Sequence, residues 1–333
     1  MAALANDWHR CKIDKKLLKS LSKRTDKPAL LWFGAYFSLV IALGIAVVLT
    51  WNTPWVWPVL LLYSLVWGAA ASGSHETCHG TPFRSRWLNE TSLWAFCWMV
   101  QMEPVWVRWG HAGHHSFTHH DVGDTELSEP NPVGWGRFFM VGTGLAGHIN
   151  YTKTLIAHAF GRFTPDIRAV IPESEIPKAI RNSRIIVASY IAIVMWALLA
   201  QSWLPVALLV APRLIGGPVI GFLHLTQHTG LQMNIFDHRF STRSFTASPI
   251  TRFFYFNMNN HIEHHMFPMV PFYNLPKLAA ALKDQMPEPC DGLLGVYREV
   301  FGAVARQYRE PGYFIKKNVP GAEMPSPVEV AAE

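Results

Sequence analysis

Hydrophobic residues gather into four long stretches of this chain, each close to the roughly 20 residues that an α-helix needs to cross a bilayer. The stretches are residues 30–50, 55–72, 185–203 and 206–223. Residues 51–54 join the first pair, and little more than Leu204 and Pro205 joins the second. Because proline and short polar turns end helices, this pattern predicts two helical hairpins that each enter and leave a membrane.

The residues that flank these stretches indicate which side of the membrane they face. A basic run precedes the first stretch: Arg10, Lys12, Lys15, Lys16, Lys19, Lys23, Arg24 and Lys27. Positive charge marks the cytoplasmic side of a membrane, and tryptophan is enriched at membrane–water interfaces. Four tryptophans lie at the other ends of the apolar stretches and mark the opposite interface: Trp51, Trp55, Trp57 and Trp203. We therefore expect a multi-pass integral membrane protein with residues 74–184 and 224–333 on the cytoplasmic side. These two segments hold nearly all the histidines.

Two segments depart from this simple pattern. Residues 93–107 are also apolar, but Gln101, Glu103 and Pro104 interrupt them, so an interfacial or re-entrant segment is expected. Arg213 lies inside the fourth stretch, where a central arginine costs about 2.5–3.5 kcal/mol on insertion scales. It is either a cation that faces a substrate tunnel and binds an acidic group, or an arginine that reaches the membrane surface from a kinked helix. The second interpretation is slightly favoured.

Composition agrees with a membrane protein, because 50% of the 333 residues are hydrophobic and 16% are charged. The formal net charge of +6 comes largely from the basic run, so it indicates topology and no nucleic-acid partner is expected. The cysteines form no CxxC pair, which argues against an iron–sulfur cluster or a disulfide scaffold and favours reduced thiols: Cys11, Cys78, Cys97 and Cys290. The first apolar stretch is too long for a signal peptide.

Histidines form four clusters on the expected cytoplasmic side. They are His75 and His79; His111, His114 and His115, followed by His119 and His120; His224 and His228; and His261, His264 and His265. An i, i+4 spacing puts two imidazoles on one helix face, yet one such pair is as often structural as it is a ligand pair. Imidazole binds zinc, iron, copper or nickel, and a zinc site takes three or four protein ligands. Even without His119 and His120, the ten remaining histidines exceed this number, so two metals are predicted.

Three of the clusters resemble the histidine boxes HxxxH, HxxHH and HxxHH of the membrane fatty acid desaturase and hydroxylase superfamily. The flanks are similar too: HETCHGTPFRSRWLNE around the first box, HHSFTHHDVGDTEL after the second, and NMNNHIEHHMFPMVPFYNLPKL around the third. The resemblance spans about residues 30–282, and the combined motif is specific. It implies an all-α membrane protein in which two transmembrane helical hairpins (four spans) carry a cytoplasmic helical cap that holds a di-metal site.

The resemblance also implies which residues bind two iron ions. The family has a further ligand between the second and third boxes, and His228 matches that position. His224 lies one turn earlier, where some relatives hold a residue that reaches the metal through water. The expected ligands are His75, His79, His111, His114, His115, His224, His228, His261, His264 and His265. No other catalytic residue is predicted.

Charge, composition and the resemblance together lead us to expect four segments. Residues 1–28 form a basic cytoplasmic segment, and residues 29–282 form a desaturase-like membrane domain. Residues 283–318 form a cytoplasmic helical tail, and residues 319–333 are expected to be disordered.

Several neighbours of the ligands have two interpretations. His119 and His120 are expected beside the ligands or at the surface, and four further histidines are expected to be ordinary: His9, His148, His158 and His238. Four carboxylates can orient the outer nitrogens of bound imidazoles, although a capping or solvated role is equally open to each: Glu76, Asp121, Asp124 and Glu263.

The expected activity follows from the resemblance. It is that of a membrane di-iron oxidoreductase that uses O2 as co-substrate to introduce a double bond into a fatty acyl or other lipid chain. The alternative within the superfamily is a hydroxylase or oxidative demethylase of a hydrocarbon or small metabolite, and a zinc hydrolase or metal transporter is the alternative from another class. No dinucleotide or haem motif is visible, so an external donor with its reductase is expected: a ferredoxin, rubredoxin or cytochrome b5.

Overall fold

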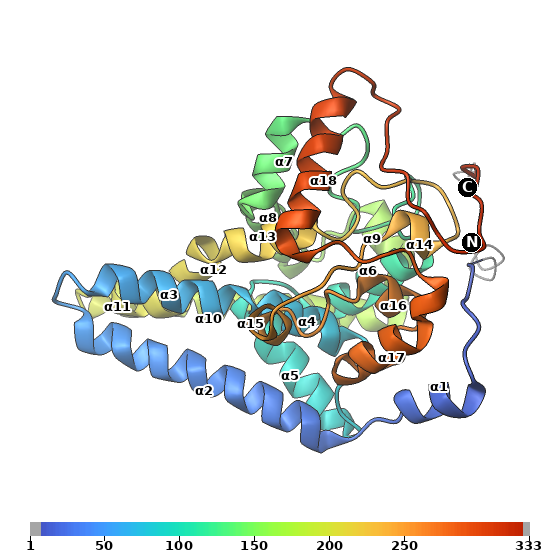
Figure 1. The fold of residues 1–333 in the computed structure, drawn as a ribbon. Coiled ribbons are helices and arrows are strands. Elements are labelled where there is room, and N and C mark those ends of the chain that lie inside the picture. The colour runs from blue at the N-terminus through green and yellow to red at the C-terminus, as the bar shows by residue number, and fades with distance from the viewer. Residues whose placement is uncertain (1–7, 329–333) are drawn as a thin grey trace. The chain divides into compact units, whose positions relative to one another are not determined.

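The computed structural model describes residues 8–328, which fold into α-helices and short 3-10 helices (Figure 1). These residues contain no strand, only two isolated β-bridges, which pair Ser244 with Asn260 and Phe245 with Cys290. The prediction of an all-α protein is therefore confirmed for this part of the chain.

Contacts divide the chain into two compact units, each assembled from segments that are far apart in the sequence. Unit 1 comprises residues 1–24, 110–141 and 223–333, and unit 2 comprises residues 25–109 and 142–222. The four segments expected from the sequence follow chain order instead. The first and last of those segments extend into residues 1–7 and 329–333, which lie outside the described residues.

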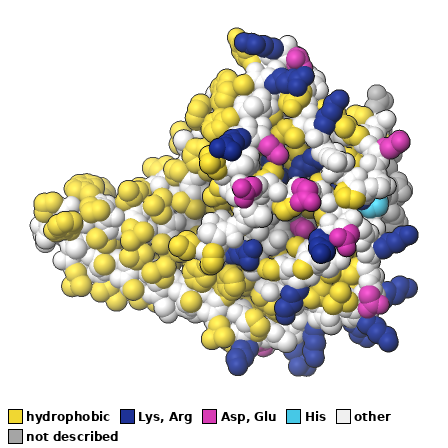
Figure 2. Space-filling view, in the orientation of Figure 1, with side chains coloured by type: hydrophobic (Ala, Val, Ile, Leu, Met, Phe, Trp, Pro, Cys, Tyr) yellow, Lys and Arg dark blue, Asp and Glu magenta, His cyan; other side chains and the backbone are white. Residues whose placement is uncertain are grey.

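Unit 2 contains the long apolar helices. Its elements are α2 (Asp26–Thr50), α3 (Val56–Gly68), α4 (Ala70–Cys78), α5 (Arg86–Met99), the first half of α6 (Pro104–Ser116), α8 (Leu145–Ala159), α9 (Pro165–Val170), η2 (Glu173–Glu175), α10 (Ile176–Leu199), α11 (Leu204–Leu209), α12 (Ala211–Ile215) and most of α13 (Gly217–Leu225). Among residues 8–328, three helical segments are long and apolar enough to cross a membrane: Asp26–Thr50, Val56–Cys78 and Glu173–Leu199. Figure 2 shows hydrophobic side chains over α2, α3 and α11, an exterior suited to lipid.

The fourth apolar stretch is not one continuous helix. Residues 204–225 form α11, α12 and α13 in succession, with breaks at Val210 and Gly216. Pro205, Pro212 and Pro218 each lie in the second position of one of these helices, where proline's missing N–H does no harm. The same prolines prevent one helix from running through the whole stretch. The structure therefore offers three continuous candidate spans where four were expected.

Arg213 of α12 is buried, with 3% of its surface exposed. Its Nε donates a hydrogen bond of 3.0 Å to the carbonyl oxygen of Val100. Val100 caps the C-terminus of α5, where carbonyl groups lack donors within the helix. The expected helix break is present, but the expectation that the Arg213 side chain reaches the membrane surface is wrong, because this carbonyl holds it inside unit 2.

Helices α3 and α12 approach each other so closely that only glycine fits at the crossing. A Cβ atom at Gly216 would lie 2.0 Å from the carbonyl oxygen of Ser64, and one at Gly68 would lie 2.5 Å from the carbonyl oxygen of Gly216. Both obstacles are backbone atoms, so no side-chain rotation relieves them. Small residues permit this kind of close packing between membrane helices.

We expect Gly216→Ala to destabilise the protein by about 1–3 kcal/mol or more, because α3 and α12 must move apart to admit the methyl group. Gly34→Ala in α2 is the matched control, because a Cβ atom there meets no atom within 4 Å and alanine is the better helix former. Thermal unfolding of both variants in detergent measures the difference. Equal midpoints for Gly216→Ala and the unmodified protein would contradict the close packing.

Unit 1 contains shorter helices. Its elements are α1 (Lys15–Leu21), the second half of α6, most of α7 (Trp135–Gly142), the end of α13, α14 (His238–Ser241), α15 (Pro249–Phe254), α16 (His261–Met266), η3 (Phe272–Asn274), α17 (Leu275–Leu282), η4 (Lys283–Gln285) and α18 (Gly292–Gln307). Arg243 is fully buried and fixes the turn after α13 by donating to the carbonyl oxygens of Thr226 (2.8 Å) and Thr229 (3.0 Å). It also pairs with Glu299 of α18 at 3.2 Å.

Residues 319–328, which belong to the last segment expected from the sequence, make contacts within unit 1. Val319 is buried in a cluster with Ile235 and Phe240. The backbone N–H of Val328 donates to the carbonyl oxygen of Asn234 at 2.7 Å. Residues 329–333 lie outside the described part of the chain.

Candidate metal centre

Three separate parts of unit 1 supply its clustered histidines. His111, His114 and His115 lie in the last two turns of α6, His228 lies in the turn after α13, and α16 carries His261, His264 and His265. Ser244 fixes the start of α16, because its hydroxyl accepts from the N–H of Ile262 at 3.0 Å and donates to Glu263 at 2.7 Å.

His114, His228 and His265 form a buried group whose ligand atoms all lie within 4.8 Å of one another. The Nδ1 of His228 lies 2.9 Å from the carbonyl oxygen of Ser241, which only accepts, so this nitrogen carries the proton. Burial, together with the nearby His114, lowers the pKa of His228 well below its ordinary value. His228 is therefore neutral, and its Nε2 presents a lone pair to the group.

Thr118 orients His265 in the same way. Its hydroxyl donates to the carbonyl oxygen of His114 at 2.8 Å, so it accepts from the Nδ1 of His265 at 3.0 Å. Burial and the adjacent His115 lower the pKa of His265 well below its ordinary value, which keeps the ring neutral. The Nε2 of His265 therefore also presents a lone pair.

Asp124 is the outer partner of His114. Its Oδ1 lies 2.9 Å from the Nδ1 of His114, and the carboxylate also accepts from the backbone N–H groups of His119 (2.7 Å) and Glu126 (2.9 Å). Burial lowers the pKa of His114, but the charge and hydrogen bond of Asp124 outweigh it and raise the pKa to about 9. The outer nitrogen is thus fixed by a carboxylate, which is a common arrangement behind metal-bound imidazoles.

His261 brings a fourth nitrogen to this group. Its Nδ1 faces the sulfur of Met258 at 3.0 Å, and its Nε2 lies 3.3 Å from that of His228 and 3.1 Å from that of His265. Two imidazole nitrogens that bind one metal at about 2.0–2.1 Å lie roughly 2.9–3.4 Å apart. Lone pairs that face one another at these distances repel, and a cation among them turns repulsion into coordination. The residues therefore fit a metal ion.

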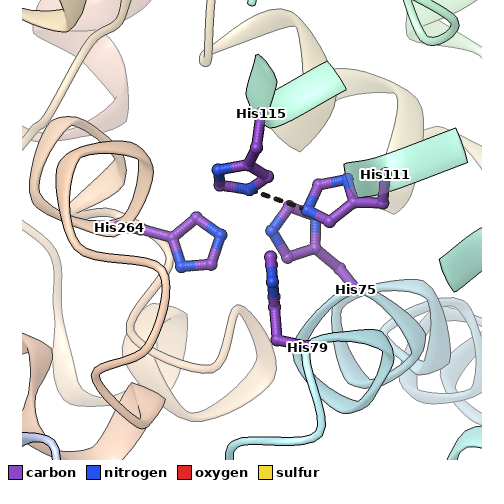
Figure 3. A group of neighbouring side chains, drawn as sticks. All are labelled: His75, His79, His111, His115 and His264. Carbon is purple, nitrogen blue, oxygen red and sulfur yellow. Dashed lines mark hydrogen bonds between the residues drawn. The ribbon is translucent and has the colours of Figure 1, made fainter. Parts of the chain in front are cut away.

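A second group in unit 1 consists of His111, His115 and His264, whose ligand atoms also lie within 4.8 Å of one another. Figure 3 shows the two α6 histidines side by side, with their Nε2 atoms 3.0 Å apart along the dashed line. The Nδ1 of His111 lies 3.1 Å from Glu126. The 3.0 Å separation suits either an N–H···N hydrogen bond or two ligands of one metal.

The two groups in unit 1 are adjacent. The rings of His115 and His265 stack with centroids 4.2 Å apart, and the rings of His111 and His114 stack with centroids 5.6 Å apart. The chain thus assembles two neighbouring sets of imidazoles, which is the arrangement that a centre of two metals requires.

His75 and His79 belong to unit 2. His75 lies in the last turn of α4, and His79 caps the C-terminus of this helix. Their ring centroids are 5.7 Å apart, so the i, i+4 spacing places both imidazoles on one face, as expected (Figure 3).

His224 contacts other groups. Its Nε2 lies 2.8 Å from the hydroxyl of Ser128 and 3.3 Å from Glu129. Glu129 is buried, and although burial raises its pKa, the charge of His224 and its hydrogen bonds lower it to about 2. His224 therefore lies against an ionised carboxylate and belongs to neither group of potential ligands in the described residues.

His119 and His120 are buried, so the alternative of a surface position is wrong for both. The Nδ1 of His119 lies 3.1 Å from the carbonyl oxygen of Gln232, and its ring lies 5.6 Å from that of His228. The Nδ1 of His120 lies 3.0 Å from the carbonyl oxygen of Thr118. The ring of His119 therefore packs beside a ligand, whereas that of His120 packs against Trp8 and Phe236.

Trp8 and His238 also line this region. The two rings stack with centroids 3.8 Å apart, and the ring of His238 lies 5.1 Å from that of His265. His238 is thus a neighbour of the centre, which its isolated position in the sequence did not indicate. Of the other histidines expected to be ordinary, His158 stacks on Phe163 with centroids 4.1 Å apart.

The carboxylates divide between the two roles that the sequence left open. Asp124 orients a histidine, whereas Glu263 accepts from Ser244 and the exposed Asp121 accepts from Asn234 at 2.8 Å. Glu126 and Glu129, which face His111 and His224, were missed by the sequence reasoning. Their signal is their position in the acidic segment after the second cluster, but only the folded loop shows which imidazole each one meets.

Comparison with known proteins supports these observations. Residues 50–293 match the family described as fatty acid desaturase. The acyl-lipid (9-3)-desaturase of Physcomitrium patens is 30% identical over 87 residues, which cover 24% of this chain and 17% of that protein. The match therefore spans less than a fifth of this relative.

Proposed function

The chain belongs to the fatty acid desaturase family, and from this premise we propose that it is an O2-dependent membrane di-iron oxidoreductase that introduces a double bond into a fatty acyl or other lipid chain. Family membership and the three apolar helices make it a membrane protein and an oxidoreductase. The observation that carries the proposal is the convergence of the Nε2 atoms of His228, His261 and His265 at separations of 3.1 and 3.3 Å.

We propose two iron ions as the cofactor. His114, His228, His261 and His265 supply four nitrogens for one ion, and His111, His115 and His264 supply three for the other. We propose His75 and His79 as further ligands, because their i, i+4 spacing puts both imidazoles on one helix face. For His224, the contacts with Ser128 and Glu129 support a place beside the centre and not a direct bond.

Bound iron would supply the reaction with O2 and with an unactivated C–H bond. The chain's own residues prepare the ligands for this task. Ser241, Thr118 and Asp124 each hold one outer imidazole nitrogen, which fixes the ring orientation and the tautomer before any substrate arrives. Six of the proposed ligands are buried, which keeps bulk water away from their nitrogens: His111, His114, His228, His261, His264 and His265.

A lipid substrate has support from the apolar exterior of unit 2, because an acyl chain reaches a membrane enzyme without crossing water. We would express the protein with its electron donor and compare total fatty acids and polar metabolites with those of a His264→Ala control. A new double bond absent from the control is the expected result. Unchanged lipids together with a hydroxylated or demethylated small molecule would replace desaturation with the alternative reaction.

We expect purified protein to be inactive with NAD(P)H alone and to need an added carrier with its reductase, of the ferredoxin, rubredoxin or cytochrome b5 type. The exposed basic residues Lys12, Lys15, Lys16 and Lys19 suit an acidic carrier. Product formation with and without each carrier measures the requirement. Turnover with NADPH and O2 as the only additions would contradict it.

We also propose a cytoplasmic location for both ends of the chain, with the broken helices α11 to α13 acting as the fourth crossing. The basic run before α2 supports this orientation. Labelling of a cysteine introduced at Pro325 with an impermeant reagent tests it, and no reaction is expected in intact cells until the membrane is opened. Labelling from outside would show that the number of crossings is odd.

A further inference from the structure

Arg213 in unit 2 carries a buried positive charge without a negative partner among the described residues. Its side chain is 3% exposed, its Nε is occupied by the carbonyl oxygen of Val100, and its buried NH1 group donates to no protein atom. The ionisable groups that interact with this charge are the phenols of Tyr151 and Tyr190 and the imidazole of His148, and no carboxylate is among them. A buried guanidinium in an apolar unit is costly unless an anion accompanies it.

Two buried polar groups of α8, the helix that meets Arg213 at Gly147, are also without partners. Gly147 of α8 lies against the guanidinium, since a Cβ atom there would be 3.9 Å from the NH2 of Arg213. The next residue, His148, has a buried Nδ1 without a partner, and one turn later Thr152 has a buried hydroxyl in the same state. Three kinds of hydrogen-bonding group, a guanidinium, an imidazole and a hydroxyl, are therefore available along this side of α8.

His148 adds a hydrogen-bonding group but no second charge. Burial, followed by the charge of Arg213, lowers its pKa below the ordinary value. At neutral pH the imidazole is thus uncharged and can donate through one nitrogen. The groups around Arg213 and His148 thus carry one positive charge in total, which matches an anion with one negative charge.

The segment around Val100, whose carbonyl oxygen accepts the hydrogen bond from Arg213, has an unusual backbone conformation. Gln101 follows Val100 and has a φ of 58°, in the left-handed region that residues other than glycine rarely adopt, and its side chain is buried. Backbone strain of this kind concentrates at functional sites. Tyr190 fixes the same segment by donating to the carbonyl oxygen of Trp98 at 2.5 Å.

We propose that Arg213, together with His148 and Thr152, binds the carboxylate group of the substrate. The inference rests on the proposed function for the existence of a substrate and adds that this substrate is an acid. A carboxylate accepts several hydrogen bonds and is the natural partner of a guanidinium. The acid can be a fatty acid from the membrane or a short carboxylic acid, and the two sources share this chemistry.

The first experiment needs no substitution. Iron-loaded protein in lipid nanodiscs is titrated by calorimetry at about pH 8, where carboxylic acids are ionised, and empty nanodiscs correct for partition into lipid. The probes are palmitate and methyl palmitate, then butyrate and methyl butyrate. We expect one of the acids to bind about 10- to 100-fold more tightly than its ester, because the ester lacks the charged oxygen that accepts the hydrogen bond from Arg213. Palmitate selectivity assigns a fatty acid, and butyrate selectivity assigns a short acid.

Variants then identify the residue. Arg213→Gln is expected to abolish the preference for the acid, whereas Arg213→Lys retains part of it because the charge remains. Arg181→Gln is the matched control, because Arg181 is an exposed arginine of α10 in the same unit. Thr152→Val serves as a milder variant if Arg213→Gln does not fold, and it should weaken acid binding with little effect on ester binding.

Equal affinity for acid and ester at both chain lengths, or an unchanged preference in Arg213→Gln, would overturn the proposal. Binding is measured without turnover, so its outcome is separate from that of the product analysis. A preference for the acid in a protein that forms no alkene leaves the Arg213 site in place and removes only desaturation. An alkene product from a protein that binds acid and ester equally well supports desaturation and removes the Arg213 site.

Discussion

Replacing His228 with alanine is expected to remove metal from the chain and to abolish turnover. The Nε2 of His228 meets those of His261 and His265, and its loss leaves the remaining nitrogens without the geometry that binds a cation. Substitution of an outer partner of a ligand already costs about 10- to 100-fold in affinity or activity, so removal of a ligand should cost more. Metal content per chain by mass spectrometry and product formation measure the two effects.

His9→Ala is the matched control for this substitution. His9 is an exposed histidine of the same unit, held only by a backbone hydrogen bond to Phe236, and its imidazole is not among the grouped ligands. Full metal content and full activity in His228→Ala would refute the assignment of this group. Stoichiometric zinc in active protein purified without added metal would remove iron from the proposal while leaving the ligands in place.

Asp124→Asn is expected to weaken metal binding by about 10- to 100-fold while the chain still folds. The substitution keeps the shape of the side chain but removes the charge that raises the pKa of His114 and makes its ring a stronger ligand. It also places an amide N–H where the carboxylate accepts from the backbone of His119 or Glu126. Competition with a chelator during metal loading measures affinity, and circular dichroism of the metal-free protein reports the fold.

Asp121→Asn, three residues away, separates charge from position. Asp121 is exposed and pairs with Asn234, so its loss should leave metal affinity unchanged within about twofold. Equal weakening in both variants would show that the acidic character of the loop matters and that the contact with His114 does not.

The sequence was sufficient to predict helices and histidine clusters because both depend on local spacing. Four residues separate His111 from His115, and one helix alone brings their nitrogens to 3.0 Å. The contact between His228 and α16 depends instead on how Arg243 folds the chain after α13. No local pattern reports that path, which is why Thr118 and Glu126 were not recognised as partners of ligands.

The fourth apolar stretch shows a second limit of sequence reasoning. Hydropathy counts the apolar residues of 206–223 but does not weigh Pro212 and Pro218, each of which begins a new helix. Likewise, the position of Arg213 in the sequence suggested that its side chain reaches the membrane surface. Its hydrogen-bond acceptor is the carbonyl oxygen of Val100, more than a hundred residues earlier, so the sequence around Arg213 does not reveal it. Long-range acceptors of this kind are invisible to a pattern that is read along the chain.

The hydroxyl of Thr118 has a consequence for how the protein matures. It donates to His114 and accepts from His265, so the proton of His265 is placed by the protein's own hydrogen bonds. Small zinc proteins, by contrast, acquire their fold from the metal itself. Here hydrogen bonds of Thr118 fix one ligand ring without the help of a metal. We therefore expect metal-free protein to keep this ring orientation and to take up metal after folding.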